Sequence, residues 1–380
     1  LVSEASITTG FLVFLFALII LFAGLSILET STNSYVYVIG PEETATARLN
    51  FAQSFNPFGA IAGVVISQVF VLSNLNTMTA AERAALSAEE LTAIQGTELS
   101  AVTSTYVAVG LVMVGILILI ALTKMPKLKE GGELDFAGTF RRLRGNRNYV
   151  WAVIAQFFYV GAQIAVWSFT IRYVLRQLNL DGVLAGLGDN PSTEQIIATL
   201  RGVEPLAAGF YNLVEAVGFT ALLPQTAEQA GATYYIMALI LFVIARFVCT
   251  ALMKVIAPHR LLTILSLLAF GCCLLTIYSD GFLGIYALVA ISGCMSLMFP
   301  TIFGMGISGL GDDTKLGGAG MVMAIAGAAV LTQIQGVVSD SAGSIKFAYW
   351  VPAIAFLVIT FYSAVIFQRA AAREDSAPTV

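Results

Sequence analysis

Apolar residues fill long stretches of this chain, and polar residues gather in the segments between them. A helix needs about 20 predominantly apolar residues to cross roughly 30 Å of hydrocarbon, and nine stretches approach or exceed that length. We therefore expect nine membrane-spanning helices. They run over Thr9–Ile39, Phe55–Leu75, Thr105–Leu122, Tyr149–Leu175, Tyr234–Met253, Leu261–Tyr278, Leu283–Phe303, Gly317–Val338 and Phe347–Phe367.

Composition supports an all-α membrane protein. Hydrophobic residues make up 58% of the chain and charged residues only 11%, with a mean hydropathy of +0.86, which leaves too few polar side chains to cover a soluble globule. The net charge of -4 is spread over the connecting segments, so it suggests no nucleic-acid partner. No nucleophile motif, metal cluster or phosphate loop supports an enzyme, and we expect no cofactor.

The four cysteines all lie in apolar stretches, where a thiol behaves as a small hydrophobic side chain. Their spacing shows no CxxC pair and no pairing with histidine, so we expect neither a metal site nor a structural disulfide. These residues are Cys249, Cys272, Cys273 and Cys294.

The basic residues predict the orientation of the chain in a bacterial-type inner membrane. If the first apolar stretch ends in the cytoplasm, 14 of the 19 lysines and arginines lie on the cytoplasmic side, as the positive-inside rule requires, and the C-terminus is cytoplasmic. These residues are Arg48, Lys124, Lys127, Lys129, Arg141, Arg142, Arg144, Arg147, Arg246, Lys254, Arg260, Lys315, Arg369 and Arg373.

Two long connections carry further expectations. Residues 124–148 are basic and contain glycine, which predicts a cytoplasmic linker between two helix bundles, 1–123 and 149–380; an ordinary positive-inside loop is the alternative. Residues 177–233 predict a long loop on the other side. Its apolar part, Pro205–Pro224, contains polar side chains, so we expect an interfacial or re-entrant helix there rather than a tenth span.

A weak internal repeat predicts twelve helices in two halves. The run Ser34–Gly40 parallels Pro300–Gly306 six helices later, and each is followed by acidic residues and then one base. Two six-helix halves related by a pseudo-two-fold axis have this spacing. The first half then needs three helices before Thr9. Since the sequence begins with Leu1, we expect it to hold nine of twelve helices, the first bundle retaining its fourth to sixth.

Glu29 is the one acidic residue, among 23, that lies well inside a strongly apolar stretch. An ionised, unpaired carboxylate is costly at membrane depth, so this position predicts a proton-binding group in a polar or water-filled cavity. The alternative is a carboxylate that reaches the cytoplasmic interface or bonds to a neighbouring helix.

Amide side chains follow Glu29 along the chain. Asn33 lies four residues on, on the same helical face, and Gln53 and Asn56 share one face at the start of the next expected helix. An amide offers both a donor and an acceptor, so it can match a sugar hydroxyl without introducing charge. We expect these three amides to bind a polar, uncharged substrate.

A second candidate wall of the cavity lies in the stretch Tyr149–Leu175. Gln156, Gln163 and Trp167 fall close to a single helical face, and a tryptophan ring supplies an apolar plane for a sugar ring. Hydrogen bonds between helices are the alternative role of each glutamine.

Pro300 interrupts the stretch Leu283–Phe303. Proline removes one backbone hydrogen bond and kinks a helix, which predicts a hinge useful in alternating access; a passive kink is the alternative.

Four runs of residues carry a resemblance to a known family. They are Leu28–Tyr35 with Gly40–Glu42, Arg48–Ala60, Trp151–Gln163 and Phe299–Phe303. In these runs the chain is similar to the bacterial fucose permease and glucose/galactose transporters of the major facilitator superfamily. The similarity covers nearly the whole chain apart from the long loops.

This resemblance implies the major facilitator superfamily fold and proton-coupled symport of a hexose or 6-deoxyhexose by alternating access. It places Glu29 at the family's protonatable glutamate, and Gln53 and Asn56 at amides that contact sugar. Phe299 stands where the fucose permease has a tyrosine in its sugar cavity, which leaves the identity of the sugar open.

Other positions depart from the family. Ser34 replaces a proline, and Ala245 and Cys249 replace the glycines of a Gly-Arg-x-x-Gly run around Arg246. The expected partners are a sugar, protons and the lipid bilayer, with the protein a monomer. Coupling to Na⁺, a substrate other than a sugar, and a receptor that binds without transporting remain as alternatives.

Overall fold

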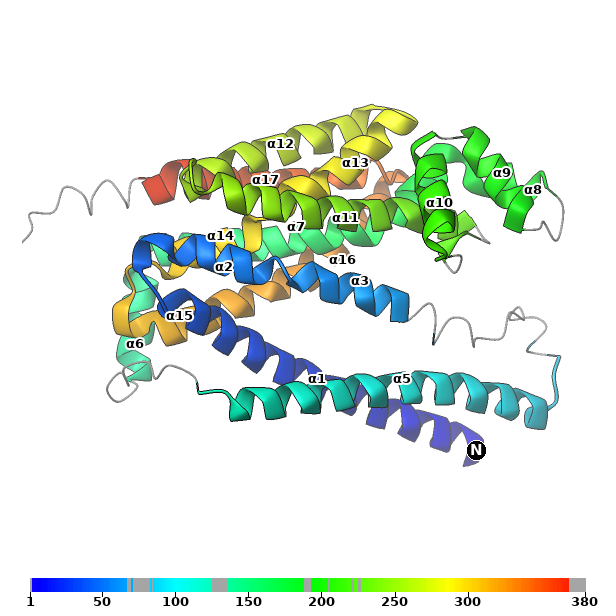
Figure 1. Ribbon diagram of the computed structural model, residues 1–380, viewed down its shortest axis with the longest axis horizontal. Coiled ribbons are helices and arrows are strands. Elements are labelled where there is room, and N and C mark those ends of the chain that lie inside the picture. The colour runs from blue at the N-terminus through cyan, green and yellow to red at the C-terminus, as the bar shows by residue number, and fades with distance from the viewer. Residues whose placement is uncertain are drawn as a thin grey trace, which may run out of the picture. The chain divides into compact units, whose positions relative to one another are not determined.

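A computed structural model of the chain describes residues 2–66, 70, 83, 85–124, 135–187, 193–203, 205–219, 222–224 and 227–368 (Figure 1). Every regular element in these residues is a helix. Contacts divide the chain into two compact units, each described by itself below. The first comprises residues 1–54, 128–189 and 226–380, and the second comprises residues 55–127 and 190–225.

The first unit holds most of the long helices. They are α1 (Val2–Val38), η1 (Glu42–Thr44), α2 (Ala45–Gln53), α6 (Phe136–Gly145), α7 (Arg147–Leu178), α8 (Leu180–Ala185), α11 (Ala227–Leu252), α12 (Pro258–Tyr278), α13 (Phe282–Met295), α14 (Met298–Ile307), η5 (Gly311–Asp313), α15 (Thr314–Met323), η6 (Ala324–Ala326), α16 (Gly327–Ala342), η7 (Phe347–Tyr349), α17 (Trp350–Phe361) and η8 (Tyr362–Phe367).

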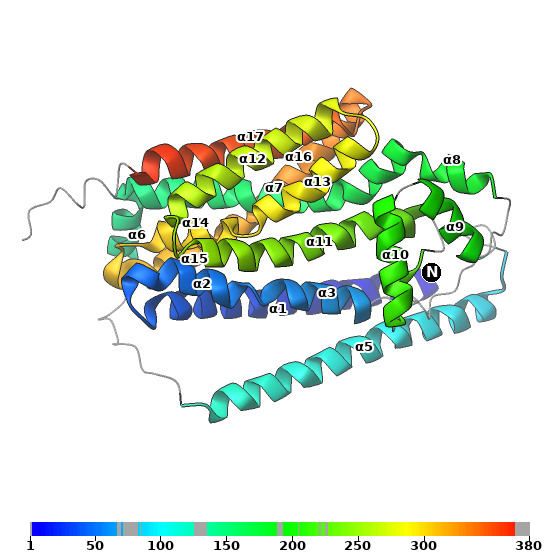
Figure 2. The ribbon, with the colours of Figure 1, turned by 45° about the horizontal axis from the view of Figure 1, so that its top comes forward.

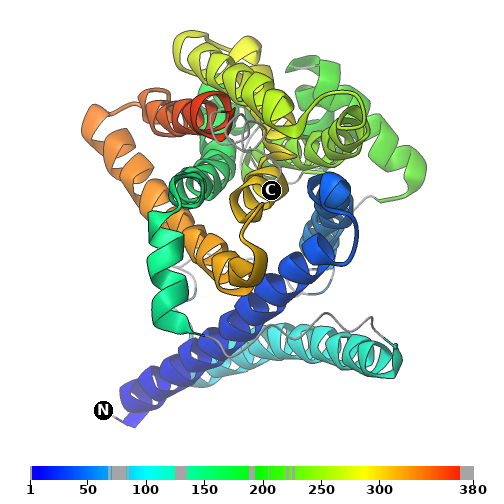
Figure 3. The same cartoon turned by 90° about the vertical axis from the view of Figure 1, so that its left-hand side faces the viewer.

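Helix α7 is the centre of this unit, because it packs against α11, α13, α14, α16 and α17. Figure 2 shows α11, α12 and α13 side by side, and Figure 3 shows α14 between α7 and α2. Small residues allow the close approach of α7 and α16. Gly161 lies against Leu331 and the main chain of Gly327, while Gly327 lies against the carbonyl of Phe157. A Cβ at either glycine would overlap its neighbours.

Eight helical segments in the described residues are long and apolar enough to cross a membrane. They are Leu12–Val38, Ala88–Leu122, Arg147–Leu178, Ala227–Leu252, Pro258–Tyr278, Phe282–Ile307, Gly311–Ala342 and Phe347–Phe367. Each overlaps a predicted span. The ninth prediction, Phe55–Leu75, falls partly outside the described residues, which include only its first twelve positions and Phe70.

Exposed apolar side chains accord with a lipid environment. On α1, Phe16 is 64% exposed and Ile19 65%, and on α5 Leu111 is 67% exposed. Side chains this apolar on the outside of a helix are favourable in hydrocarbon and unfavourable in water.

The second unit contains α3 (Asn56–Ile66), α5 (Ala88–Leu122), α9 (Thr193–Val203) and α10 (Pro205–Val217). The sequence predicted that the span in α5 begins at Thr105, which is wrong, because α5 begins 17 residues earlier, at Ala88. Ser87 and Glu90 form a capping box at its start, so a polar helical extension precedes the apolar part. Helix α10 has 13 residues, fewer than the roughly 20 that cross a bilayer.

One predicted helix is interrupted. Gln53 and Asn56 were expected on a single helix, but α2 ends at Gln53 and α3 begins at Asn56, with a turn at Ser54 and Phe55. Pro57 explains the interruption, because proline cannot donate the main-chain hydrogen bond of a continuous helix, although it is tolerated in the first turn of a new one. The expectation of one shared helical face was therefore wrong.

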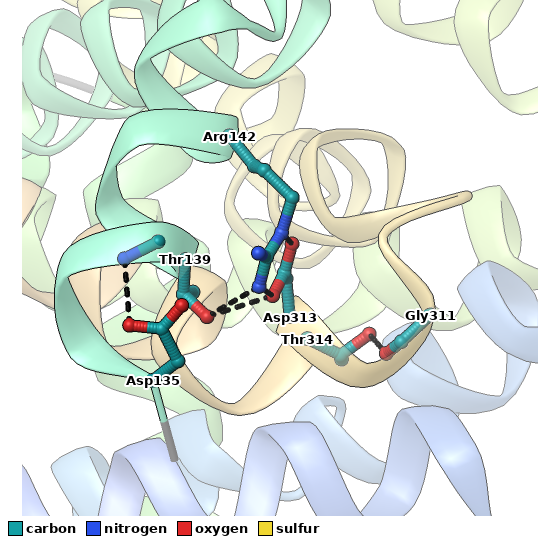
Figure 4. A network of polar contacts seen from close by, with 7 residues as sticks. Asp135, Thr139, Arg142, Gly311, Asp313 and Thr314 are labelled. Atoms are coloured by element: carbon teal, nitrogen blue, oxygen red, sulfur yellow. Dashed lines mark hydrogen bonds and ion pairs between the residues drawn. The ribbon is translucent and has the colours of Figure 1, made fainter.

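Helix α6 forms part of the predicted linker and lies across the end of α7 (Figures 1 and 3). Asp135 caps its first turn by accepting a hydrogen bond from the Gly138 N–H at 2.9 Å. Arg142 pairs with Asp313 through two hydrogen bonds of 2.8 and 2.7 Å, and Thr139 donates a third to the same carboxylate (Figure 4). These contacts hold α6 against the segment before α15.

Arg142 stays protonated in this contact, because its hydrogen bonds to Asp313 raise the pKa of the guanidinium above its ordinary value. Other bases used to predict the orientation lie outside the described residues, namely Lys127, Lys129, Arg369 and Arg373.

Candidate functional site

Glu29 and Asn33 lie one turn apart on α1. Glu29 is partly buried, and in the described residues no hydrogen bond or ion pair is found at its carboxylate. Asn33 is only 2% exposed. The helix therefore carries one acid without a partner in the described structure and one buried amide beside it.

The side chains of Asn33 and Gln53 form a hydrogen-bonded amide pair. Nε2 of Gln53 donates to Oδ1 of Asn33 at 2.6 Å, which connects α1 with the last residue of α2. The Nδ2 group of Asn33 is buried and has no hydrogen-bond partner in the described part of the chain. The pair therefore presents an unused amide donor, which can match a hydroxyl oxygen.

Arg246 lies beside this pair and was not predicted as a site residue. It was counted among the cytoplasmic bases, but it lies within α11 and is only 4% exposed, so it is not a surface group. Nη1 donates to the main-chain oxygen of Gln53 at 2.7 Å, and Nε donates to that of Ser296 at 2.5 Å. Its guanidinium carbon also sits 4.7 Å from the centre of the Phe242 ring.

Aromatic side chains continue the cluster from Arg246. Phe242 meets Trp167 edge to face, with ring centres 5.3 Å apart, and Tyr235 packs on the same indole at 6.2 Å. Nε1 of Trp167 donates to the hydroxyl of Ser292 at 3.1 Å. Trp167 is thus held by α11 and α13 with its ring partly exposed, which is compatible with the predicted stacking surface.

Phe299 belongs to a neighbouring aromatic group. Its ring centre lies 6.3 Å from that of Tyr159 on α7, and it stacks on Phe303 at 6.3 Å. The fully buried Tyr159 donates to the carbonyl of Met295 at 3.1 Å, so it ties α7 to the end of α13.

The two glutamines of α7 differ in burial. Gln156 is fully buried, and neither its amide oxygen nor its amide nitrogen has a hydrogen-bond partner in the described residues. Gln163 is partly buried. A buried amide without protein partners is costly, which makes Gln156 a candidate for contact with a ligand.

The first unit therefore connects Asn33, Gln53, Arg246 and, through Phe242, Trp167. Asn56, the remaining predicted amide, is exposed at the first position of α3 and belongs to the second unit. The signal that could have identified Arg246 was its position inside an apolar stretch, where an ionisable side chain is a functional candidate. No group of three or more metal-binding side chains is found in the described residues.

Comparisons with known proteins show which family the chain resembles. No family model matches the chain. It is 34% identical over 359 residues to the L-fucose-proton symporter of Escherichia coli (strain K12), covering 93% of this chain and 72% of that protein. It is 28% identical over 353 residues to a glucose/galactose transporter of Brucella abortus biovar 1 (strain 9-941), covering 92% of this chain and 70% of that protein.

Solved structures agree. The crystal structure of an asparagine-to-alanine variant of the E. coli fucose:proton symporter superposes with a TM-score of 0.73 at 33% identity, over 90% of this chain and 74% of that one. A major facilitator superfamily transporter, FucP, in the outward conformation gives a TM-score of 0.72 at 34% identity, over 90% of this chain and 73% of that one.

The apolar spanning helices and the similarity to transporters show an integral membrane protein of the transporter class. The chain belongs to the family of L-fucose-proton symporters and glucose/galactose transporters, within the major facilitator superfamily. The named members are transporters, not enzymes, and those named as proton symporters carry L-fucose. The predicted fold class and family are thereby confirmed.

Proposed function

We propose that the protein carries a monosaccharide, a hexose or 6-deoxyhexose, across the membrane together with a proton. The observation that carries this function is the Asn33–Gln53 amide pair, with its unused donor, one turn from the partly buried Glu29. Proton-coupled relatives 34% and 35% identical to the chain support the same function.

In this proposal the amides select the substrate and the acid couples it to the proton. Asn33 and Gln53 bind sugar hydroxyls, Trp167 and Phe299 provide apolar planes, and Gln156 and Gln163 of α7 contribute further amides. Asn56 is a separate sugar-binding candidate on the second unit. Glu29 takes up a proton when the sugar enters and releases it on the other side of the membrane. A carboxylate at membrane depth suits this role because its neutral form costs far less to bury than its charged form.

We also propose that residues 1–123 and 149–380 form two bundles joined by the linker 124–148. The contacts of α2 with α11 and α14 then lie between the bundles and must separate during alternating access. The similarity to a transporter in the outward conformation supports this assignment. The basic residues support a bacterial-type inner membrane with the C-terminus in the cytoplasm.

The test is sugar uptake into proteoliposomes under an imposed proton gradient, with Glu29→Gln compared with the parent protein. We expect the variant to lose accumulation against a sugar gradient and to keep part of its sugar exchange, because glutamine mimics the protonated acid. Glu43→Gln is the matched control, since Glu43 is an exposed acid in η1, just beyond the end of α1.

Each alternative has its own signature in this assay. Uphill uptake that survives in Glu29→Gln overturns the coupling role of the acid. Uptake that follows a Na⁺ gradient and ignores the proton gradient establishes sodium coupling. Sugar binding without movement across the vesicle membrane establishes a receptor.

A further inference from the structure

Pro57 and Pro300 each lie just after a helix break, Pro57 at the start of α3 and Pro300 at the start of α14. Each removes one main-chain N–H donor. In an α-helix each carbonyl accepts from the N–H four residues later, and proline has no N–H. Pro57 follows Gln53 by four residues, and Pro300 follows Ser296 by four residues. The carbonyls of Gln53 and Ser296 are therefore the two that lose their helical donors.

The side chain of Arg246 reaches both of these carbonyls. It donates from Nη1 to the oxygen of Gln53 at 2.7 Å and from Nε to the oxygen of Ser296 at 2.5 Å. A guanidinium holds its N–H groups in a rigid planar fork, so one side chain can serve two acceptors on different helices. Proline lacks the N–H that would bond each carbonyl in a helix, and the guanidinium of Arg246 donates to each carbonyl instead.

We propose that Arg246 is a positioning residue, which replaces the donors missing at Pro57 and Pro300 and thereby holds the sugar-binding amide of Gln53 in place. The inference rests on the proposed role of Gln53 in sugar binding. In this role the Arg246 side chain binds main-chain carbonyls rather than forming an ion pair.

The surroundings of Arg246 support a structural use of its charge. Its side chain is buried, and no carboxylate forms a salt bridge with it in the described residues. A buried cation needs compensation, which two carbonyl dipoles and the face of the Phe242 ring supply. The same bonds satisfy two main-chain oxygens whose helical donors are replaced by proline.

The position of Gln53 explains why its bond to Arg246 matters for the proposed sugar site. Gln53 is the last residue of α2, so its backbone is not held by a continuing helix. Arg246 binds its carbonyl while Asn33 binds its side-chain amide. Without the arginine, the end of α2 can rotate and the amide pair loses its orientation.

The test restores the missing donors in the absence of the arginine. Arg246→Met is expected to raise the KM for sugar about tenfold, as loss of one charge-assisted hydrogen bond predicts, and to lower the thermal unfolding midpoint by about 3 °C or more. Adding Pro57→Ala supplies an N–H for the Gln53 carbonyl and is expected to recover most of the KM. Adding Pro300→Ala supplies the Ser296 donor and is expected to recover part of the midpoint.

Arg48→Met is the matched control. Arg48 also donates to main-chain oxygens, those of Val36 at 2.9 Å and Tyr37 at 2.6 Å, but to neither carbonyl in question. We expect neither Pro57→Ala nor Pro300→Ala to offset its effects. Arg246→Lys keeps the charge without the planar fork and is expected to fall between the parent and Arg246→Met.

The outcomes separate this inference from the proposed function. Equal losses in Arg246→Met with and without the proline changes overturn the inference, and so does an unchanged midpoint in Arg246→Met. The unfolding measurements need no transported sugar. Coupling between Arg246 and the prolines in a protein that moves no sugar supports the main-chain role and refutes the transport proposal alone.

Discussion

Asn33 and Gln53 meet through their amide groups at 2.6 Å, although α1 and α2 present them from different helices. Gln53 donates and Asn33 accepts, which leaves the Asn33 nitrogen as a donor without a partner in the described structure. The direction of this bond fixes what Asn33 can offer to a substrate, which is an N–H group.

We expect Asn33→Ala to weaken sugar binding strongly. The substitution removes the unused donor and deprives the Gln53 amide of its acceptor, and an unsatisfied buried polar group costs about 1–3 kcal/mol. The KM for sugar should therefore rise roughly 5- to 150-fold.

Asn33→Asp separates the two effects, because it keeps the acceptor for Gln53 and lacks the N–H. If the free donor binds sugar, the aspartate variant transports as poorly as the alanine variant. Normal transport by Asn33→Asp contradicts a direct role for this donor. Uptake kinetics and thermal unfolding of the three proteins decide between these results.

Gln156→Met should stabilise the protein in the absence of sugar. The parent amide is fully buried, with both polar atoms unpartnered in the described residues, and a methionine of similar shape carries no such groups. Replacing an unsatisfied polar group by an apolar one is expected to gain about 1 kcal/mol. Thermal unfolding measures this gain, and added sugar should stabilise the variant less than the parent if the amide binds sugar.

Gln335→Met provides the comparison for that result. Gln335 on α16 is also fully buried with both amide atoms unpartnered in the described part of the chain, but it is not among the proposed sugar contacts. We expect the same gain in unfolding midpoint and an unchanged response to sugar. Identical sugar responses in the two variants contradict a specific role for Gln156.

Gly327→Ala should destabilise the contact between α7 and α16. A Cβ at this position overlaps the main-chain carbonyl of Phe157, which cannot move aside as a flexible side chain can. Overpacking of this kind costs about 1–3 kcal/mol and lowers the unfolding midpoint.

Gly336→Ala on the same helix is its control. The nearest atom to a Cβ there is a ring carbon of Phe169 at 3.9 Å, which is an ordinary contact distance. Alanine in a helix interior is favoured over glycine by roughly 0.5–1 kcal/mol, so this variant should be neutral or more stable. A similar loss in both variants contradicts the close-packing explanation.

The spanning helices could be predicted because hydropathy reports directly on lipid exposure. Helix breaks were harder to locate. Pro300 was predicted to interrupt its helix, but the helix stops earlier, at Met295, and Pro300 is the third residue of the next helix. Proline is tolerated in the first turn, where no intrahelical donor is needed. Pro57 likewise lies in the first turn of α3, and the helix break before it was not predicted.

Candidate side chains were easier to find than their contacts. Glu29 and Asn33 were identified because polar groups are conspicuous in an apolar stretch, and their helical spacing was correct. The pairing of Asn33 with Gln53 depends on how α1 meets α2, which no local pattern encodes. Arg246 was misplaced because a positive-inside count treats every base as a surface group. Its hydrogen-bond acceptors are backbone carbonyls, which a search for oppositely charged side chains does not find.

The bonds of Arg246 have a consequence for how such a carrier can diversify. Since the arginine binds carbonyl oxygens, which every amino acid possesses, residues 53 and 296 can be replaced without withdrawing the acceptors it uses. New substrate preferences can then arise at position 53 while the support beneath it stays intact. The scaffold and the specificity of the carrier are free to evolve separately.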